Sequence, residues 1–172
     1  MAIRNIRVDG DEILRKKCKP IKEMTPRLKE LIADMFETMY DADGVGLAGP
    51  QVGILKRLCV IDTGEEGEKV ALINPEIIKA EGEQEGGEGC LSIPEKLGIV
   101  KRPYYVTVKA LDEDMNEVEI EAEGFFARAI CHELDHLDGV LYKDLAEGDL
   151  MSAEEFAEYM EEHGMVEEEG EE

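Results

Sequence analysis

The sequence predicts an α+β fold in which mixed or antiparallel β-sheets pack around a central helix carrying a His-Glu-x-x-His motif, with one further helix on each side of it in the chain. Three observations lead to this class. Apolar residues recur at helical spacing in an early, a late and a final segment. Short runs with a period of two fill the middle. Helical and strand patterns do not alternate regularly, which disfavours a parallel doubly wound sheet.

The first helix is expected to begin at Thr25-Pro26, because threonine caps helices and proline suits the first helical position. It should end near Tyr40. Two loops are expected, a glycine-rich one over residues 44–53 and a glycine/glutamate one over residues 81–89. Strands are expected over residues 57–62, 70–73, 76–80, 104–111 and 117–121, the last two as a hairpin.

The central helix is expected from Gly124, with Gly139 as its stop. Its apolar stripe consists of Phe126, Ile130, Leu134 and Leu137. A capping box at Ser152 should open the final helix, which turns Phe156 inward. Residues 1–164 are therefore expected to form one domain. The acidic segment 165–172 is expected to be a disordered and catalytically dispensable tail.

Composition narrows the classes of function. The 42 Asp and Glu outnumber the 19 Lys and Arg, giving a net charge of −23, so direct nucleic-acid binding and attraction to anionic lipid are not expected. No apolar run is long enough to span a membrane, and the N-terminal residues do not resemble a secretory signal. The four cysteines are scattered, which fits reduced thiols in the cytoplasm.

The strongest chemical signal is His132-Glu133-Leu134-Asp135-His136. Histidines at positions i and i+4 lie on one helix face and can bind one metal ion, with Glu133 beside it as general acid/base. The alternative is a helix with two incidental surface histidines. Since the chain has only three histidines, the metal site is favoured.

A hydrolytic metal site needs a third protein ligand. Tyr142 stands where metzincins place a third histidine, and a downstream glutamate would have to come from a polar helix face that carries Glu154, Glu155 and Glu158. Cys90 is the better candidate because it follows Gly89 in an expected loop. Alone it is ambiguous, since an ordinary buried cysteine is the interpretation favoured for Cys18 and Cys59.

The segment Gly44–Gln51 contains a formal GxGxxG pattern, but it follows a helix instead of a strand. A dinucleotide fingerprint is therefore rejected, and a phosphate loop is excluded because no Gly-Lys-Ser/Thr follows. The loop instead suits close approach of backbone to a ligand, with Gln51 presenting its amide.

Together the three segments resemble peptide deformylase, whose family pattern has GxGxAAPQ, EGCLS and HExDH motifs in this order. The likeness extends from about Ile6 to Leu145. Three departures stand out: Gly49 replaces a usual alanine, Cys131 precedes the first histidine where glutamine is common, and the C-terminal tail is acidic. Ribosome contact through a basic C-terminal extension is therefore not expected, and Cys131 should not bind the ion.

The resemblance implies removal of the formyl group from N-formylmethionyl peptides and nascent chains. It implies one divalent ion, usually Fe²⁺, bound by Cys90, His132 and His136. Donor chemistry alone also allows Zn²⁺, Ni²⁺ or Co²⁺. Glu133 carries over as the catalytic acid/base, and Gln51 with the backbone N–H of Leu91 as donors to the oxyanion.

Substrate contacts are expected from both sides of the site. Ala129 leaves room for a side chain beside the ion, and Val45, Gly46 and Gly89 would form other walls. Arg128 would meet peptide carbonyls at the mouth, with a surface salt bridge as the equal alternative.

Two other functions remain open. An HExxH endopeptidase would share the metal and Glu133 but not favour Cys90 as ligand. A binding module without turnover would need neither Glu133 nor Gln51.

Overall fold

The computed structural model describes residues 2–163 of the chain. Its α-helices are α1 (Pro26–Asp41), α2 (Gly124–Leu137) and α3 (Ala153–Glu162), and its 3₁₀ helices are η1 (Glu12–Arg15), η2 (Gly49–Val52) and η3 (Tyr142–Asp144). Its strands are β1 (Gly46–Ala48), β2 (Leu58–Asp62), β3 (Lys69–Glu81), β4 (Gln84–Cys90), β5 (Ile93–Arg102), β6 (Tyr105–Leu111), β7 (Glu117–Glu123) and β8 (Glu147–Met151). The predicted tail, 165–172, lies outside the described residues.

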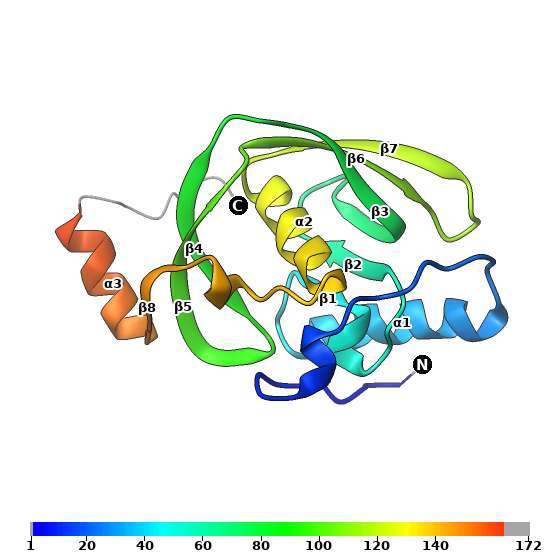
Figure 1. Cartoon of the computed structure of the whole chain (residues 1–172), viewed down its shortest axis with the longest axis horizontal. Coiled ribbons are helices and arrows are strands. Elements are labelled where there is room, and N and C mark those ends of the chain that lie inside the picture. The colour runs from blue at the N-terminus through cyan, green and yellow to red at the C-terminus, as the bar shows by residue number, and fades with distance from the viewer. Residues whose placement is uncertain (1, 164–172) are drawn as a thin grey trace.

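Helix α2 lies between two antiparallel sheets (Figure 1). One sheet has the strand order β1-β2-β3-β6-β7 and the other β4-β5-β8. The helix contacts β1, β2, β6 and β7 of the first sheet and β5 of the second. This arrangement confirms the predicted α+β class and sets the helix with the His-Glu-x-x-His motif where both sheets can contribute to a site.

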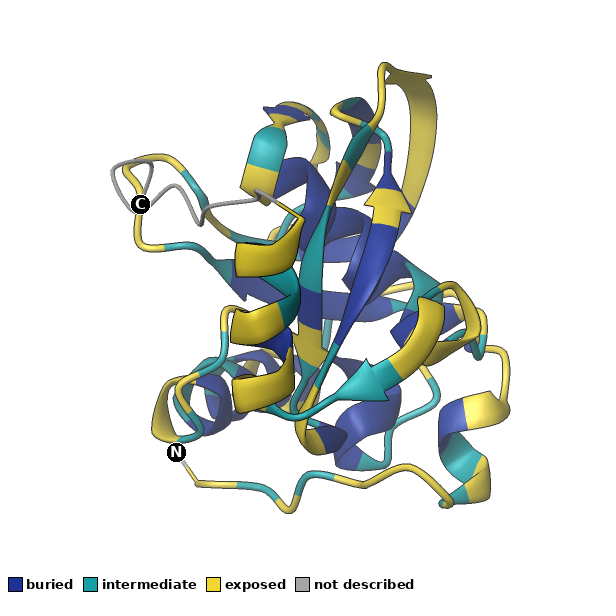
Figure 2. Ribbon diagram, turned by 90° about the vertical axis from the view of Figure 1, so that its left-hand side faces the viewer, coloured by how far each residue is buried: buried dark blue, intermediate teal, exposed yellow. Residues whose placement is uncertain are grey.

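Helix α2 lies in the centre of the molecule because most of its side chains are apolar or buried. Its predicted stripe, Phe126, Ile130, Leu134 and Leu137, is buried against apolar residues of β2, β3, β6 and β7. Eleven of its fourteen residues are buried, including His132, Glu133 and His136. In Figure 2 the buried colour is concentrated in the interior, whereas α3, which faces the viewer, is exposed over most of its surface.

The two outer helices begin where capping chemistry predicted. The hydroxyl of Thr25 accepts a hydrogen bond from the N–H of Leu28 at 3.1 Å, with Pro26 as the first helical residue. Ser152 accepts from the N–H of Glu155, whose carboxylate accepts from the N–H of Ser152, so the capping box is complete. Phe156 is the buried residue of α3, as predicted.

Both predicted glycine loops are partly wrong. Residues 46–48 form β1 and residues 49–52 form η2. Most of the predicted loop 81–89 is strand β4, paired with a strand β5 that the pattern did not predict. The runs at 70–73 and 76–80 belong to one strand, β3, which is interrupted by a register shift around Pro75 because proline cannot donate to the ladder.

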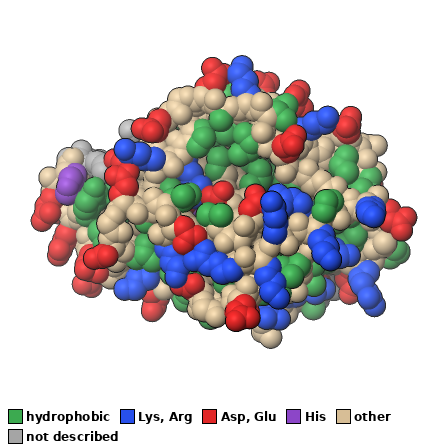
Figure 3. Space-filling model, in the orientation of Figure 1, with side chains coloured by type: hydrophobic (Ala, Val, Ile, Leu, Met, Phe, Trp, Pro, Cys, Tyr) green, Lys and Arg blue, Asp and Glu red, His purple; other side chains and the backbone are tan. Residues whose placement is uncertain are grey.

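Charged side chains are unevenly spread over the surface. Figure 3 shows Lys and Arg gathered over the lower and right-hand part of the view, where the N-terminal segment and α1 lie, and Asp and Glu over α3 at the left. Among residues 2–163, none of the helices combines the length and the apolar character that a membrane crossing requires.

Candidate active site

Helix α2 and strand β4 bring together three side chains that could hold a metal ion. His132 and His136 lie one turn apart on α2, and Cys90 ends β4. Their donor atoms all lie within 4.8 Å of one another. The Nε2 atom of His136 is 3.3 Å from Nε2 of His132 and 3.4 Å from Sγ of Cys90.

These separations fit a single ion. Ligand bonds of about 2.0–2.1 Å to nitrogen and about 2.3 Å to sulfur, set at tetrahedral angles, place neighbouring donors about 3.3 Å (N to N) and about 3.6 Å (N to S) apart. The observed 3.3 and 3.4 Å come close to these edges. Two imidazoles and a thiol are also a donor set suited to a divalent transition metal. The three side chains therefore fit a metal ion.

The orientation of His132 is fixed from behind by Glu88. Oε1 of Glu88 accepts a hydrogen bond from Nδ1 of His132 at 2.8 Å, which turns Nε2 of the ring toward Cys90 and His136. A carboxylate in this position sets the tautomer of a ligand histidine and makes its free nitrogen a better donor. A register shift separates Glu88 from Cys90 on β4, and the contacts of Glu88 with His132 and of Cys90 with His136 show that both side chains face α2.

Two arginines in turn hold Glu88. Arg102 donates to both carboxylate oxygens, at 2.7 and 2.8 Å, and Arg128 donates to Oε2 at 2.7 Å. Arg102 also reaches Asp135 at 2.6 Å. Burial by itself would raise the pKa of Glu88, but the hydrogen bonds from Arg102 and His132 outweigh it and hold that pKa well below its ordinary value. Glu88 is therefore a buried carboxylate that stays ionised.

Glu133 lies against the glycine-rich segment. It is 4% exposed, and its Oε2 atom is 4.0 Å from Nε2 of His132. A β-carbon on Gly46 would lie 2.4 Å from that oxygen, so only glycine leaves room for the carboxylate. Oε1 has no hydrogen-bond partner among the described residues. Burial raises the pKa of Glu133 to about 7, within reach of proton exchange at neutral pH.

The amide of Gln51 faces the same space from η2. Its Oε1 accepts from the N–H of Ala48 at 2.9 Å, which fixes the amide orientation. Its Nε2 donates to the hydroxyl of Ser92 at 3.0 Å and lies 3.6 Å from Sγ of Cys90. An amide nitrogen carries two hydrogens, and the one directed at Sγ of Cys90 makes the longer and weaker of these two hydrogen bonds.

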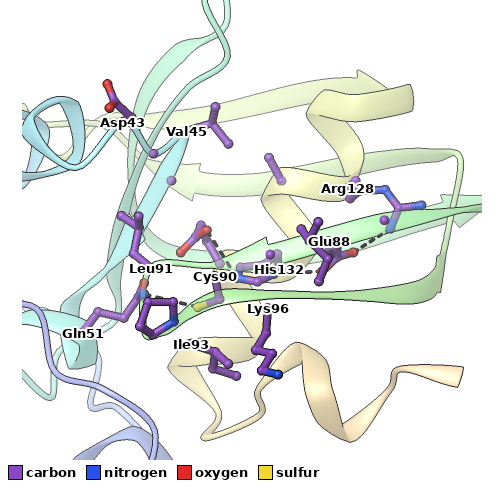
Figure 4. A pocket seen from close by; sticks show the side chains of 18 of the residues that line it. Asp43, Val45, Gln51, Glu88, Cys90, Leu91, Ile93, Lys96, Arg128 and His132 are labelled. Carbon is purple, nitrogen blue, oxygen red and sulfur yellow. Dashed lines mark hydrogen bonds and ion pairs between the residues drawn. The ribbon is translucent and has the colours of Figure 1, made fainter. Parts of the chain in front are cut away.

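A cavity of about 560 Å³ opens beside these groups. In Figure 4 Gln51, Cys90 and His132 converge at its base, with Glu88 and Arg128 in line behind His132. Ten of the eleven predicted site residues line it, namely Val45, Gly46, Gln51, Gly89, Cys90, Leu91, Arg128, Ala129, His132 and Glu133. His136 is 1% exposed and lies beneath the wall, with its Nε2 atom toward the other two donors.

Arg128 is not in a surface salt bridge, the alternative that its sequence position left open. It is 6% exposed and donates to Glu88 and to the carbonyl of Val100 at 3.1 Å. It also lines the cavity, so the predicted contact with substrate stays a prediction.

Sequence reasoning missed Glu88 and Arg102. The position of Glu88 two residues before Cys90 could have indicated a shared strand face, had β4 been predicted. Nothing in the pattern of β5 distinguished Arg102.

The other candidates for a third ligand do not reach the site. Tyr142 is buried, with its ring 6.0 Å from that of His132, and its hydroxyl donates to the carbonyl of Lys96. Glu154, Glu155 and Glu158 are exposed on α3, as predicted. Cys18, Cys59 and Cys131 are buried, and burial raises the pKa of each thiol, to about 11 for Cys18 and Cys131.

Sequence and structure comparisons agree with one another. A sequence profile described as Polypeptide deformylase matches residues 3–149. A peptide deformylase from Lachnoclostridium phytofermentans is 58% identical over 163 residues, covering 94% of this chain and all of the relative. Peptide deformylase 1 from Clostridium acetobutylicum is 63% identical over 150 residues, covering 87% of this chain and 99% of the relative.

Solved structures give the same result. The crystal structure of peptide deformylase from Thermotoga maritima superposes with a TM-score of 0.82 at 45% identity, covering 85% of this chain and 99% of that one. The enzyme from Synechococcus elongatus, in complex with actinonin, superposes with a TM-score of 0.80 at 40% identity, covering 95% of this chain and 87% of that one. The chain belongs to the peptide deformylase family, a family of metal-dependent hydrolases that remove the N-formyl group from nascent peptides.

Proposed function

We propose that this chain hydrolyses the formyl amide of N-formylmethionyl peptides with Glu133 as its acid/base and one divalent ion on Cys90, His132 and His136. The observation that carries the proposal is the convergence of those three donors beside a buried glutamate at the base of a cavity. We assign Fe²⁺ as the ion, since a thiolate and two imidazoles suit it and the family resemblance favours it.

An ion held there supplies Lewis acidity, which makes a water molecule a better nucleophile at neutral pH. The protein groups do the rest. Glu133 takes the proton from the attacking water and returns it to the departing amine of methionine. Its confinement against Gly46 keeps the carboxylate beside the reacting carbon. Burial, which brings its pKa to about 7, suits both halves of this transfer.

Negative charge that develops on the formyl oxygen needs donors. Gln51, whose amide is fixed by Ala48, would present to that oxygen the N–H that now lies toward Sγ of Cys90, and the backbone N–H of Leu91 at the tip of the β4–β5 turn would be the second donor. Loss of one such donor typically costs about 3–4 kcal/mol of barrier. Gln51 and Leu91 are thus proposed as the oxyanion donors.

The remaining wall of the cavity suits an apolar side chain next to the formyl group. Ala129 and Gly89 leave space, while Val45 and Leu91 supply apolar surface. Phe125 also lines the cavity and is 55% exposed, which places it at the rim. We propose that the methionine side chain lies in this space and that Gly46 and Arg128 contact the peptide beyond it.

Replacing Glu133 by alanine tests the acid/base assignment. Turnover of a formyl-Met peptide, followed by formate release, should fall about 10²–10⁴-fold. Metal content should stay at one ion per chain, since the three donors are untouched. Glu85 on β4 is exposed and serves as the matched control: Glu85→Ala should keep both activity and metal.

Near-normal turnover by Glu133→Ala would overturn the assignment. The wild-type protein, purified without oxygen, should contain iron by elemental analysis and should not cleave casein. Casein hydrolysis would favour the endopeptidase alternative, and metal binding without formate release would favour the binding module.

A further inference from the structure

The N-terminal segment forms no wall of the active site, yet its backbone is hydrogen-bonded to residues that belong there. We call residues 6–11 the strap. In Figure 1 this segment, in dark blue, runs along the lower edge of the molecule. None of its residues, which all lie in the described part of the chain, lines the active-site cavity. The side chains of Arg7, Val8 and Asp9 are exposed, so the strap holds its neighbours mainly through backbone groups.

Two backbone N–H groups of the strap donate to two different elements. The N–H of Arg7 donates to the carbonyl of Gln51 on η2 at 2.7 Å. The N–H of Asp9 donates to the carbonyl of Ser92, in the turn between β4 and β5, at 2.8 Å. Only Val8 separates the two donors, so the strap limits how far apart η2 and the turn can lie.

These two hydrogen bonds complete a closed ring. Gln51 and Ser92 are also joined directly, because Nε2 of Gln51 donates to the hydroxyl of Ser92 at 3.0 Å. The ring therefore passes through Arg7, Gln51, Ser92 and Asp9. One proposed oxyanion donor, the amide of Gln51, is part of this ring, and the other, the N–H of Leu91, belongs to the residue before Ser92.

The strap is anchored on both sides of the ring by apolar contacts. Ile6 packs against the apolar cluster that contains Val52 of η2. Leu14, just past the strap, is buried in the separate cluster that contains Ile93 of β5. Because its two ends pack on different elements, the strap connects the part of the molecule that carries Gln51 to the part that carries the β4–β5 turn.

We propose that the strap positions the oxyanion site, with Arg7 and Asp9 as positioning residues that act through their backbone N–H groups. The proposal rests on the proposed function, in which Gln51 and Leu91 donate to the oxyanion. Such donors stabilise a transition state only when they are held at the right distance from the developing charge. The single side-chain hydrogen bond between Gln51 and Ser92 fixes a distance between two atoms, whereas the ring also fixes the angle between their elements.

The turn at the end of the strap allows one N–H to be removed with little change to the backbone. The N–H of Asp11 donates to the carbonyl of Val8 at 3.0 Å, and Gly10 has a φ of 106°. This is the arrangement of a type II turn, in which proline is favoured at the second position, here occupied by Asp9. Asp9→Pro should therefore keep the turn while losing the N–H that donates to Ser92.

The matched comparison is Asp9→Ala. Both variants lose the ion pair between Asp9 and Lys143, but Asp9→Ala keeps the N–H. In the full-length, metal-loaded protein, kcat for a formyl-Met peptide should be about tenfold lower in Asp9→Pro than in Asp9→Ala, because displaced donors stabilise the transition state less. KM should agree within about twofold, since the oxyanion exists only in the transition state. Both variants should hold one ion per chain, and Lys143→Ala should turn over substrate like the wild type.

A double variant separates positioning from a merely structural role. In Gln51→Ala one of the two donors that the strap positions is gone, so the difference in kcat between Pro and Ala at position 9 should shrink to less than about threefold. The comparison of Arg7→Pro with Arg7→Ala tests the hydrogen bond to Gln51 in the same way. Circular dichroism and urea unfolding establish that each variant is folded at the assay temperature.

Equal kcat in the proline and alanine variants at both positions would overturn the proposal. A tenfold difference that persists in Gln51→Ala would also overturn it, by placing the effect of the strap elsewhere. Loss of metal in Asp9→Pro would assign the strap to the ligand Cys90 instead, and unfolding of both proline variants would make it a requirement of the fold alone. Failure of the proposed function would look different, because the wild type would release no formate or Gln51→Ala would keep its full kcat.

Discussion

Glu88 shows how much of the site depends on a residue that does not touch the proposed ion. It fixes the ring of His132 through Nδ1 and is itself held by Arg102 and Arg128. A buried carboxylate is costly unless paired, and here its oxygens accept four charge-assisted hydrogen bonds. The ligand geometry is thus set by a network that spans β4, β5 and α2.

The proximity of His132 and His136 could be predicted from spacing, because two histidines at i and i+4 meet on a helix wherever that helix lies. Cys90 could be proposed only beside them, since nothing local separates a ligand cysteine from a core cysteine. Arg102 and the pairing of Arg128 with Glu88 could not be predicted. They depend on which strand lies across from α2, and that is tertiary information.

Cysteine labelling provides a test of the ligand set at the residue scale. After removal of metal by a chelator, iodoacetamide at pH 8 should alkylate Cys90, which is half-buried at the cavity. Cys18, Cys59 and Cys131 should resist, because they are buried and their pKa values are raised. Reloading with Fe²⁺ without oxygen should protect Cys90. Mass spectrometry locates the label, and equal labelling with and without metal would rule out Cys90 as a ligand.

The close contact between Gly46 and Glu133 gives a prediction about catalysis. In Gly46→Ala the new β-carbon would lie 2.4 Å from Oε2 of Glu133 and must displace that carboxylate. We expect kcat to fall about 100-fold with metal content unchanged, since small misplacements of a reacting group have effects of this size.

Gly44→Ala is the comparison for this variant, because its β-carbon would meet only the flexible end of Leu91, at 2.6 Å. It should change KM more than kcat. Equal kcat losses in the two variants would mean that Gly46 has no special relation to Glu133.

At the scale of elements, the missed strand β4 has a physical explanation. Gly86, Gly87 and Gly89 make the segment look like a loop, yet each glycine is where another element comes close. A β-carbon on Gly87 would lie 2.3 Å from the ring of Phe156 on α3, and one on Gly89 would lie 3.1 Å from Leu97 on β5. Glycine in a strand interior often marks such close approach, which a single sequence does not reveal. By contrast, α1 and α3 had predicted caps at their starts, and α2 had a clear apolar period.

The contact between Gly87 and Phe156 predicts a coupling between β4 and α3. Gly87→Ala should destabilise the protein by about 1–3 kcal/mol in urea unfolding, because it overpacks this contact. The double variant with Phe156→Ala should lose clearly less unfolding free energy than the two single variants lose together, since the clash disappears with the ring. Additive costs would show that α3 does not dock through this ring.

Across the whole molecule, charge is divided along the chain. Residues 58–172 hold 33 of the 42 acidic residues but 8 of the 19 basic ones. A large excess of one sign destabilises a compact state through self-repulsion, and salt screens that repulsion.

Salt should therefore stabilise this protein. Raising NaCl from 50 to 500 mM should increase the free energy of unfolding by about 1 kcal/mol. For a chain of this size that corresponds to a rise in Tm of about 2–4 °C. Thermal unfolding followed by circular dichroism measures the shift, with potassium glutamate as a second salt to separate screening from specific chloride binding. A Tm that falls with both salts would show that attractive charge pairs outweigh the repulsion.

The separation of the site residues along the chain has a consequence for folding order. Cys90 and His136 are 46 positions apart, His132 and Glu88 are 44 apart, and Gln51 and Ser92 are 41 apart. Among the three proposed ligands only the two histidines are close in sequence, four positions apart. Such long-range contacts form after the loops between them have closed. The unfolded chain can offer an ion little more than that histidine pair, so the complete site exists only in the native state. Metal then binds as a late step, and by mass action it stabilises the folded protein that captures it.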